Sequence, residues 1–291
     1  MALIEEENLN APVSIHLKAD GPAFAEGIPL HLLTGTLFEF QAILDKTYLG
    51  LSGKRKLTKE DRSHFYVLSP GIKHSSIETD LGLVLTGVQT AFPFFSGLGP
   101  KGIWEYTKQT YEFLKQVYEA MHKGKQPTYS WSGDNSQFQV NTGTQNNVYN
   151  GPVFNIGQMS VAHYHALSKP VQEKSITSYN FGDASIGSVG LGTREADLFS
   201  LPSVVEDAPI KFRGEIFDFN KFENIGKLHI GESEPVKKGD YRFEVIGKQD
   251  VSVYIEAMLR TQVTITCLRE ISPNPFSTEK IVRFQVIGVE P

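Results

Sequence analysis

Two histidines that could bind a metal flank a tyrosine in the segment SVAHYHALSKP, which runs from 160 to 170. Zinc-binding helices place their histidines three or four residues apart, whereas residues two apart point about 200° away from each other around a helix. The alanines at 162 and 166 and the closing proline favour a helix here. We therefore predict that His163 and His165 are solvated or cap the helix and bind no metal; a metal-dependent hydrolase that uses them is our third hypothesis for the chain.

A glycine-rich segment, FGDASIGSVGLGT (181–193), follows an expected strand and could bind a phosphate group. A phosphate-binding P-loop requires Lys and then Ser or Thr directly after its last glycine, followed by a helix. Here Thr193 and Arg194 follow Gly192, and the glycine spacing differs from the dinucleotide-binding pattern. We interpret the segment as a flexible linker between two domains, although the sequence does not settle whether 182–193 is only a linker.

The most basic segment, GKRKLTKEDR, could contact phosphate or nucleic acid. Two acidic residues, Glu60 and Asp61, dilute its charge, and no aromatic nucleic-acid motif follows it. A solvated loop is the first interpretation, and a phosphate or nucleic-acid contact is the second. The cations concerned are Lys54, Arg55, Lys56, Lys59 and Arg62.

No residue set supports covalent catalysis. The chain lacks the G-x-S-x-G motif of serine hydrolases. Cys267, its only cysteine, lies in VTITCLRE, where we expect a strand that buries it together with Val263 and Ile265. The carboxylates Glu78 and Asp80 carry no usable signal, because a solvated strand face is the usual reason for such a pair. We therefore predict no catalytic residue, no metal ligand and no cofactor, and we favour a non-enzymatic protein.

A helix rich in aromatic residues is expected after Pro100, where apolar residues recur every three or four positions. Tyr106 and Phe113 lie off the main apolar stripe, so the helix has two apolar faces. Such a helix is either enclosed in its domain or forms an interaction surface. Core packing is the first interpretation. A surface for a protein partner or a second copy is the other, and it would use Trp104, Tyr106, Tyr111, Phe113 and Tyr118.

The remaining elements of the first 200 residues follow from periodicity, caps and turns. Thr58 and Asp61 have the spacing of a capping box that begins a short helix. Strands are expected before and after the Ser-Pro-Gly turn at 69–71. Other expected elements are strands at 13–18, 138–140, 148–149, 153–156 and 176–181, and helices at 29–49 and at 159–167, the last stopped by Pro170.

The last part of the chain, from 207 on, contains five segments with the alternation of strands. A small antiparallel barrel is the natural way to close five short strands without exposed edges. The segment DVSVYIEAML fits either a strand or a short helix. RFEVIG (242–247) is echoed by RFQVIG (283–288), which we attribute to two strands in similar environments. The expected strands are 210–220, 226–230, 241–246, 263–270 and 281–289.

Bulk composition narrows the class of protein. The chain has 291 residues and a net charge of −5, which argues against a general nucleic-acid-binding protein. A single cysteine fits a reducing compartment. The beginning of the chain has no basic or apolar run typical of a signal peptide, and no apolar stretch approaches the ~20 residues of a membrane span. We therefore expect a soluble, cytoplasmic protein without membrane contact.

These observations predict an α+β fold. The region 1–200 should form a mixed domain with two long amphipathic helices and a sub-boundary near 124–135, and 207–291 a small antiparallel β-barrel. The leading hypothesis is a non-enzymatic binding, sensor or scaffold protein with a protein partner or self-association; its general character suggests a bacterial phage-defence or other accessory system. The alternative is a nucleic-acid-associated module that uses the barrel and the 54–62 segment.

Overall fold

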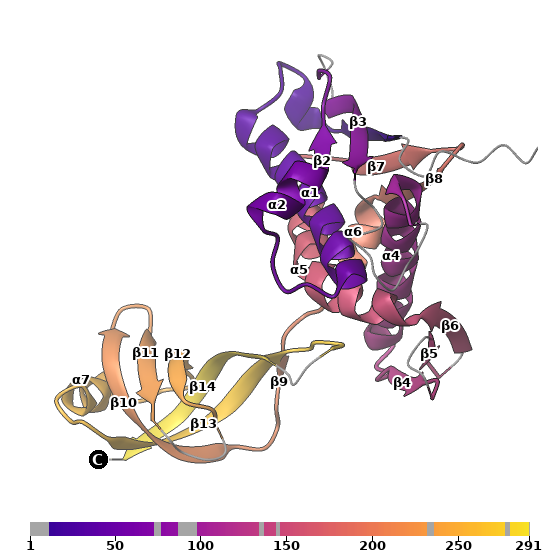
Figure 1. Ribbon diagram of the computed structural model, residues 1–291. Coiled ribbons are helices and arrows are strands. Elements are labelled where there is room, and N and C mark those ends of the chain that lie inside the picture. Colours follow the sequence, from indigo (N-terminus) through magenta and orange to yellow (C-terminus); the bar gives the residue numbers. More distant parts are fainter. Residues whose placement is uncertain are drawn as a thin grey trace, which may run out of the picture. The chain divides into compact units, whose positions relative to one another are not determined.

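The computed structural model describes residues 12–72, 77–86, 98–133, 137–143, 146–231, 236–276 and 280–290. The chain divides into two compact units, Met1–Ser200 and Leu201–Pro291. The first combines helices with sheets and the second contains a closed barrel, so the predicted α+β fold with a small barrel domain is confirmed (Figure 1). Among the described residues, no helix combines the length and the apolar character that crossing a bilayer requires.

The first unit contains a five-stranded sheet in which all neighbouring strands are antiparallel. Ile15, Leu17 and Ala19 on its central strand are fully buried, while the side chains between them keep solvent contact. One face of the sheet is therefore covered and the other is open, as the alternation at 13–18 predicts. In spatial order the strands are β2 (Phe65–Leu68), β3 (Ile77–Leu85), β1 (Val13–Asp20), β7 (Ser178–Asp183) and β8 (Gly187–Leu191).

Helices pack on the covered face of this sheet. Phe40 stacks on Phe181 of β7 with ring centroids 4.6 Å apart, and it also contacts Trp104 of a second helix at 6.4 Å. The helices expected at 29–49 and after Pro100 are confirmed as α1 and α4. The helices of this unit are η1 (Pro22–Phe24, a 3-10 turn), α1 (Leu30–Ser52), α2 (Lys59–His64), α4 (Pro100–His122), α5 (Gly151–Gln172) and α6 (Thr193–Leu198).

The start and end of α5 differ from the prediction. The strand expected at 153–156 is wrong, because Pro152 occupies the first helical turn, where its fixed φ favours a helix. Val153 and Ile156 are three residues apart and both fully buried, as on one helix face. The helix also continues past Pro170 to Gln172, because a proline in the last turn removes only one hydrogen bond from a helix that is about to end.

A three-stranded antiparallel sheet lies between α4 and α5 in the sequence and belongs to the first unit. The sub-boundary expected near 124–135 also falls inside this unit, which is not divided there. Its buried side packs against Phe113 of α4, whose ring lies 5.3 Å from that of Phe138. Its other side bears uncharged polar side chains and Val148. The strands, in spatial order, are β4 (Thr128–Trp131), β5 (Gln137–Asn141) and β6 (Asn146–Asn150).

The second unit contains the five expected strands, which close into a barrel because β10 pairs with both β11 and β13. All these neighbours are antiparallel except β12 and β14, which are parallel. A strand of two residues, β9 (Val204–Val205), pairs with β13 and precedes the expected domain start at 207. Around the barrel the strands are β10 (Ile210–Asn220), β11 (Ile225–Ile230), β12 (Gly239–Val245), β14 (Lys280–Glu290) and β13 (Val263–Ser272).

The barrel core accounts for Cys267 and for the segment DVSVYIEAML. Cys267 is fully buried, and burial raises the pKa of its thiol to about 12, so it is the core residue that we expected. The segment DVSVYIEAML forms helix α7 (Val251–Ala257), which Asp250 caps by accepting from the backbone N–H of Ser252. Tyr254 on this helix packs into the barrel core.

The order of strands around the barrel matches a known topology. Counted from β10, it runs first, second, third, fifth, fourth and back to the first. The helix α7 lies between the third and fourth strands. A five-stranded Greek-key barrel connected in this way has the topology of the OB-fold.

Candidate functional site

A row of five charged side chains crosses neighbouring strands on the outside of the barrel. Strand pairing brings these side chains together from five different strands of the barrel, so no local sequence motif reveals them. They line a hollow of about 610 Å³, a size typical of small-ligand sites. In order around the barrel they are Asp218, Lys227, Arg242, Arg283 and Glu270.

The echo between RFEVIG and RFQVIG accounts for the two arginines at the centre of the row. The strands β12 and β14 are parallel neighbours, with Phe243 opposite Phe284. Both phenylalanines point into the core, where they are 1% and 0% exposed. Arg242 and Arg283 each precede one of them and so lie next to each other on the outer side.

Arg283, which lies next to Glu270 in the row, is held in place by carboxylates. Arg283 donates through Nε to Glu270 Oε2 at 2.5 Å and pairs through Nη1 with Glu244 Oε2 at 2.6 Å. Glu270 is only 7% exposed and also accepts a hydrogen bond from Ser203 Oγ at 2.5 Å. The hydrogen bonds from Ser203 and Arg283 lower the pKa of Glu270, so this carboxylate is ionised at neutral pH.

The central arginine differs from its neighbours. Lys227, on its other side, lies 3.2 Å from Asp218. Arg242 is exposed and forms no hydrogen bond or ion pair with the residues that the structure describes. Its guanidinium therefore keeps its donors available for an anionic group such as phosphate or carboxylate.

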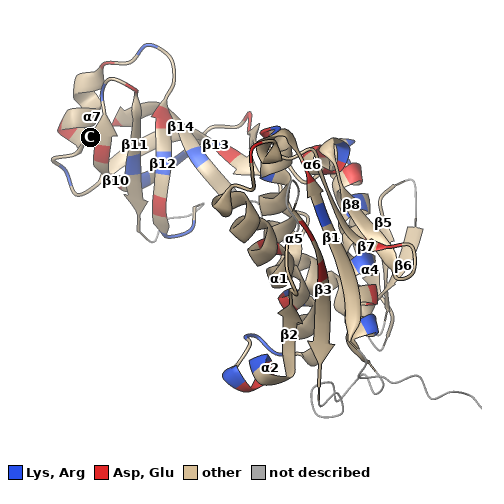
Figure 2. Ribbon diagram, turned by 90° about the horizontal axis from the view of Figure 1, so that it is seen from above, with Lys and Arg blue, Asp and Glu red and all other residues tan. Residues whose placement is uncertain are grey.

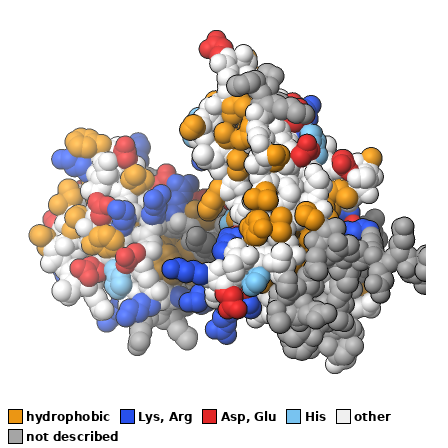
Figure 3. Space-filling model, turned by 45° about the horizontal axis from the view of Figure 1, so that its top comes forward, with side chains coloured by type: hydrophobic (Ala, Val, Ile, Leu, Met, Phe, Trp, Pro, Cys, Tyr) orange, Lys and Arg blue, Asp and Glu red, His pale blue; other side chains and the backbone are white. Residues whose placement is uncertain are grey.

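The charges around the hollow do not form the continuous basic surface that a long polyanion requires. Figure 2 shows basic and acidic positions together on neighbouring barrel strands, and Figure 3 shows both signs interspersed over the visible face of this unit. Around the hollow, three cations stand against three carboxylates, so their charges cancel. They are Lys227, Arg242 and Arg283 against Asp218, Glu244 and Glu270.

Apolar side chains complete the hollow. Ile225 and Val282 line it and are 42% and 43% exposed. Asn220 and Ile225, at the two ends of the loop between β10 and β11, line the hollow, and the loop carries Phe222, which is 87% exposed. Lys221 Nζ lies 5.2 Å from the centroid of that ring. An exposed ring next to a residue that lines the hollow can stack on a planar group of a ligand.

The basic segment at 54–62 serves the fold with two of its five cations. Lys54 Nζ donates to Asp61 at 2.5 Å, and the guanidinium of Arg62 pairs with Asp45. Its other three cations are exposed and form no such contact with described residues, which leaves the predicted phosphate contact without a defined binding geometry. They are Arg55, Lys56 and Lys59.

Asp61 is the centre of this corner. It is 3% exposed and forms the predicted capping box with Thr58, so that prediction is confirmed. It also accepts a hydrogen bond from Tyr48 at 2.9 Å. Burial opposes its ionisation, but the donors Lys54, Thr58 and Tyr48 outweigh burial and hold the pKa of this carboxyl well below its usual range.

The aromatic residues of α4 lie mostly in the core. Trp104, Tyr111, Phe113 and Tyr118 are between 0% and 7% exposed, and Tyr106 is partly buried. Tyr111 donates to Gly190 O, and the ring of Tyr118 lies 5.4 Å from that of Phe199. Core packing therefore accounts for this helix, and we do not carry it forward as an interaction surface.

The glycine-rich segment is part of the first unit, and its interpretation as a linker is wrong. It forms the hairpin β7–β8 and leads into α6. Gly182 and Gly187 flank the turn with φ of 89° and 74°, which favour glycine. These two glycines permit a tight turn packed against Trp104 and Lys108 of α4.

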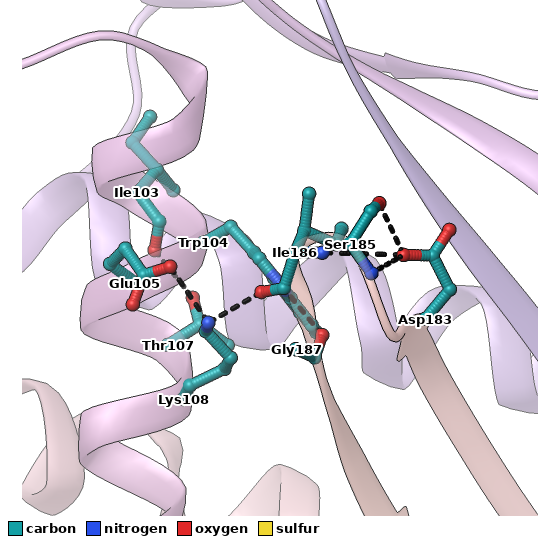
Figure 4. Close-up of polar contacts among 9 residues, drawn as sticks. All are labelled: Ile103, Trp104, Glu105, Thr107, Lys108, Asp183, Ser185, Ile186 and Gly187. Carbon is teal, nitrogen blue, oxygen red and sulfur yellow. Dashed lines mark hydrogen bonds and ion pairs between the residues drawn. The ribbon is translucent and has the colours of Figure 1, made fainter.

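Figure 4 shows how α4 holds this turn. Trp104 Nε1 donates to the carbonyls of Ile186 and Gly187 at 3.2 and 3.3 Å. Lys108 Nζ donates to Ile186 O at 2.5 Å. The carboxylate of Asp183 accepts from the backbone N–H groups of Ser185 and Ile186 on the other side of the turn. These bonds satisfy the turn internally, so we assign it a structural role.

The two histidines lie on a helix, as predicted, and face different ways. His163 Nδ1 lies 2.7 Å from Glu39 Oε2 of α1, while His165 is exposed. Within the described part of the chain, no group of three or more His, Cys, Asp or Glu side chains is arranged to hold a metal ion. The two histidines are not arranged to chelate a metal together, so the hypothesis of a metal-dependent hydrolase gains no support from the described residues.

Comparison with family models, with curated proteins and with solved structures finds no match to this chain.

Proposed function

We propose that the chain is a non-enzymatic binding protein and that the outer face of β11, β12 and β14 is its binding site. The observation that supports this most is Arg242, an exposed guanidinium at the centre of a hollow of about 610 Å³. Its two cationic neighbours are each tied to a carboxylate, whereas Arg242 has no such partner among the described residues. Anion binding would therefore begin at Arg242.

The ligand that fits best carries one anionic group on an aromatic or apolar body. The planar guanidinium of Arg242 suits two parallel hydrogen bonds to a phosphate or carboxylate. Ile225 and Val282 would contact the apolar body, and Phe222 would stack on a ring. The carboxylates around the hollow would repel a second anionic group, which favours a compact ligand over a long polyanion.

A second candidate is a nucleic-acid-associated module, and the barrel topology favours it. OB-folds bind oligonucleotides on the face of their second and third strands, which here are β11 and β12. Phe222 is an exposed ring of the kind on which bases stack. The OB-fold topology supports this candidate by analogy of fold, whereas the balanced charge of the hollow and the net charge of −5 weigh against it.

Ligand-observed NMR with a panel of small aromatic phosphates and carboxylates tests the first candidate. We expect signals of at least one member to broaden with the wild type and to recover with Arg242→Ala. Arg213→Ala is the matched control, since Arg213 is an exposed arginine on β10 outside the hollow, and it should bind as the wild type does. Absence of any binder, or equal binding by Arg242→Ala, would overturn the proposal.

Fluorescence anisotropy with a labelled oligothymidylate separates the second candidate from the first. Binding that is lost in Arg242→Ala and falls steeply with salt, with a log–log slope of about −0.7 per phosphate contacted, would replace the compact ligand by single-stranded nucleic acid. Weak binding that is insensitive to Arg242→Ala would reject the nucleic-acid candidate.

The biological setting is part of the proposal only in outline. A bacterial defence or accessory system, a cytoplasmic location and a role as sensor or scaffold remain predictions from the general character of the sequence. A compact-ligand site on the barrel would suit a sensor, because ligand binding there could be signalled through the rest of the chain.

A further inference from the structure

The edge strand β6 lacks the protection that exposed sheet edges normally carry. It hydrogen-bonds to β5 on one side, and within the described part of the chain no strand pairs with its other side. Proteins usually guard such an edge with charged residues, proline or a bulge, because its free N–H and C=O groups can pair with another strand. β6 reads NNVYN, with no charge and no proline, and its register with β5 is continuous.

The three strands of this sheet carry no charged side chain. The described residues between 127 and 150 include no Asp, Glu, Lys or Arg. Val148, at the centre of β6, is 61% exposed on the outward side of the sheet. Strand pairing places Val148 opposite Gln139 of β5, and Gln139 opposite Ser130 of β4. An apolar β-branched side chain at the middle of an open edge is suited to a strand–strand contact.

The edge is also held rigidly in a strand conformation. Tyr149 donates to Gln116 Oε1 at 2.7 Å, and Asn150 donates through Nδ2 to Gln109 Oε1 at 3.2 Å. The ring of Tyr149 lies 5.4 Å from that of Phe113 in an edge-to-face arrangement. A partner strand would therefore meet a preformed edge and lose little ordering entropy on binding.

We infer that β6 is a self-association site at which two copies of the chain pair antiparallel across a two-fold axis. Complete overlap of the two β6 strands puts the axis at Val148, with each Val148 opposite its counterpart and each Asn146 opposite Asn150 of the second copy. The result is a continuous six-stranded sheet in which both β6 edges are satisfied. A two-fold pairing closes on itself and does not propagate into a filament.

A second copy fits this edge better than a charged partner does. The edge offers no cation to an acidic partner and no carboxylate to a basic one. Two copies repel through their net charge of −5 each, and the β6 strands add no charge of their own, although Glu112 of α4 is near enough to Tyr149 to raise the pKa of its hydroxyl. Five residues of overlap cover less than the ~800 Å² per partner of a standard interface, so the dimer is expected to be weak and concentration-dependent.

Disulfide trapping tests the predicted register. Cα atoms of directly opposed residues in an antiparallel pair lie about 4.5–5.5 Å apart, within the range that a disulfide spans. The only native cysteine, Cys267, is fully buried, so an intermolecular disulfide would form only through the introduced cysteine. We expect Val148→Cys to form a covalent dimer under mild oxidation much faster than Ser130→Cys, its control on the opposite edge strand. Equal rates, or a monomeric Val148→Cys, would overturn the inference.

Charge reversal provides a second test in which misfolding cannot imitate the expected result. By sedimentation velocity we expect wild-type dimer at concentrations up to about 0.5 mM, and monomer for Val148→Lys and Val148→Glu alone. A one-to-one mixture of the two variants should dimerise again, because the opposed positions then carry opposite charges. A monomeric wild type over this range, or a mixture that behaves like its components, would contradict the inference. The inference does not depend on the function proposed for the barrel.

Discussion

Two basic clusters of this molecule, the 54–62 corner and the barrel hollow, each pair two cations with carboxylates, and they differ in where their remaining cations lie. The three remaining cations of the corner are exposed and do not line the hollow, whereas Arg242 lines it. At the corner, Lys54 turns inward to a carboxylate that is 3% exposed, and the pair secures the end of α1. In the hollow, the outer cations are tied to carboxylates while Arg242 projects between them with no such partner among the described residues. The density of cations in a sequence therefore indicates binding less well than the surroundings in which the fold places each cation.

The largest effect that would sharpen this comparison is expected at Asp61. Asp61→Asn removes the charge that Lys54 and the capping box share, and we expect the first unit to lose about 2–4 kcal/mol of unfolding free energy. Both tryptophans of the chain, Trp104 and Trp131, lie in this unit, so tryptophan fluorescence during urea denaturation measures its unfolding. The exposed neighbour Glu60 is the control, and Glu60→Gln should change stability by less than about 0.5 kcal/mol. Equal effects of both variants would refute the structural role of the corner.

A smaller effect is expected in the barrel at Glu270. Glu270→Gln breaks its charged bond with Arg283 and should destabilise the barrel by about 1.5–3 kcal/mol at neutral pH. Because folding lowers the pKa of Glu270 from its usual 4.5, its contribution is complete above that value and is lost as pH falls through the lowered folded pKa. Hydrogen exchange of β13 and β14 should show this difference at pH 7 and a smaller one below pH 4.5. A difference that grows on acidification would contradict the assignment.

The smallest effects on stability are expected for two arginines, Arg62 at the corner and Arg242 in the hollow. These two should differ most clearly in their effect on ligand binding. Arg62→Ala should cost the first unit about 0.5–1 kcal/mol, because the lost ion pair with Asp45 is partly exposed. Arg242→Ala should leave the stability of the barrel unchanged within about 0.5 kcal/mol while it abolishes ligand binding. Thermal unfolding followed by circular dichroism measures both. A clearly destabilised Arg242→Ala would mean that this arginine also serves the fold.

Local signals in the sequence were enough to predict most elements. Apolar spacing predicted α1 and α4, alternation predicted β10 at its observed bounds of 210–220, and the pair Thr58 and Asp61 predicted a cap. Where local signals conflicted, the prediction failed: Val153 and Ile156 are β-branched, yet Pro152 begins a helix there. Glycines at 182–193 permit a tight turn, which composition alone does not distinguish from a flexible linker.

The binding face could not be predicted because it depends on strand order. Arg242 and Arg283 are neighbours only because β12 and β14 are parallel neighbours in a closed barrel, although α7 and β13 separate them in the chain. The echo of RFEVIG and RFQVIG was the one available signal. It pointed to two similar environments, and only the structure adds that these environments lie side by side.

The most direct test of the account is a titration of the 15N-labelled chain with phenyl phosphate, an anion on an aromatic ring, followed by 1H–15N spectra. We predict that shifts concentrate at Arg242 and at its neighbours on β11, β12 and β14, and that the 54–62 corner stays unchanged. Shifts confined to Arg55, Lys56 and Lys59, or no shifts at all at millimolar phenyl phosphate, would contradict the claim that the barrel hollow is the binding site.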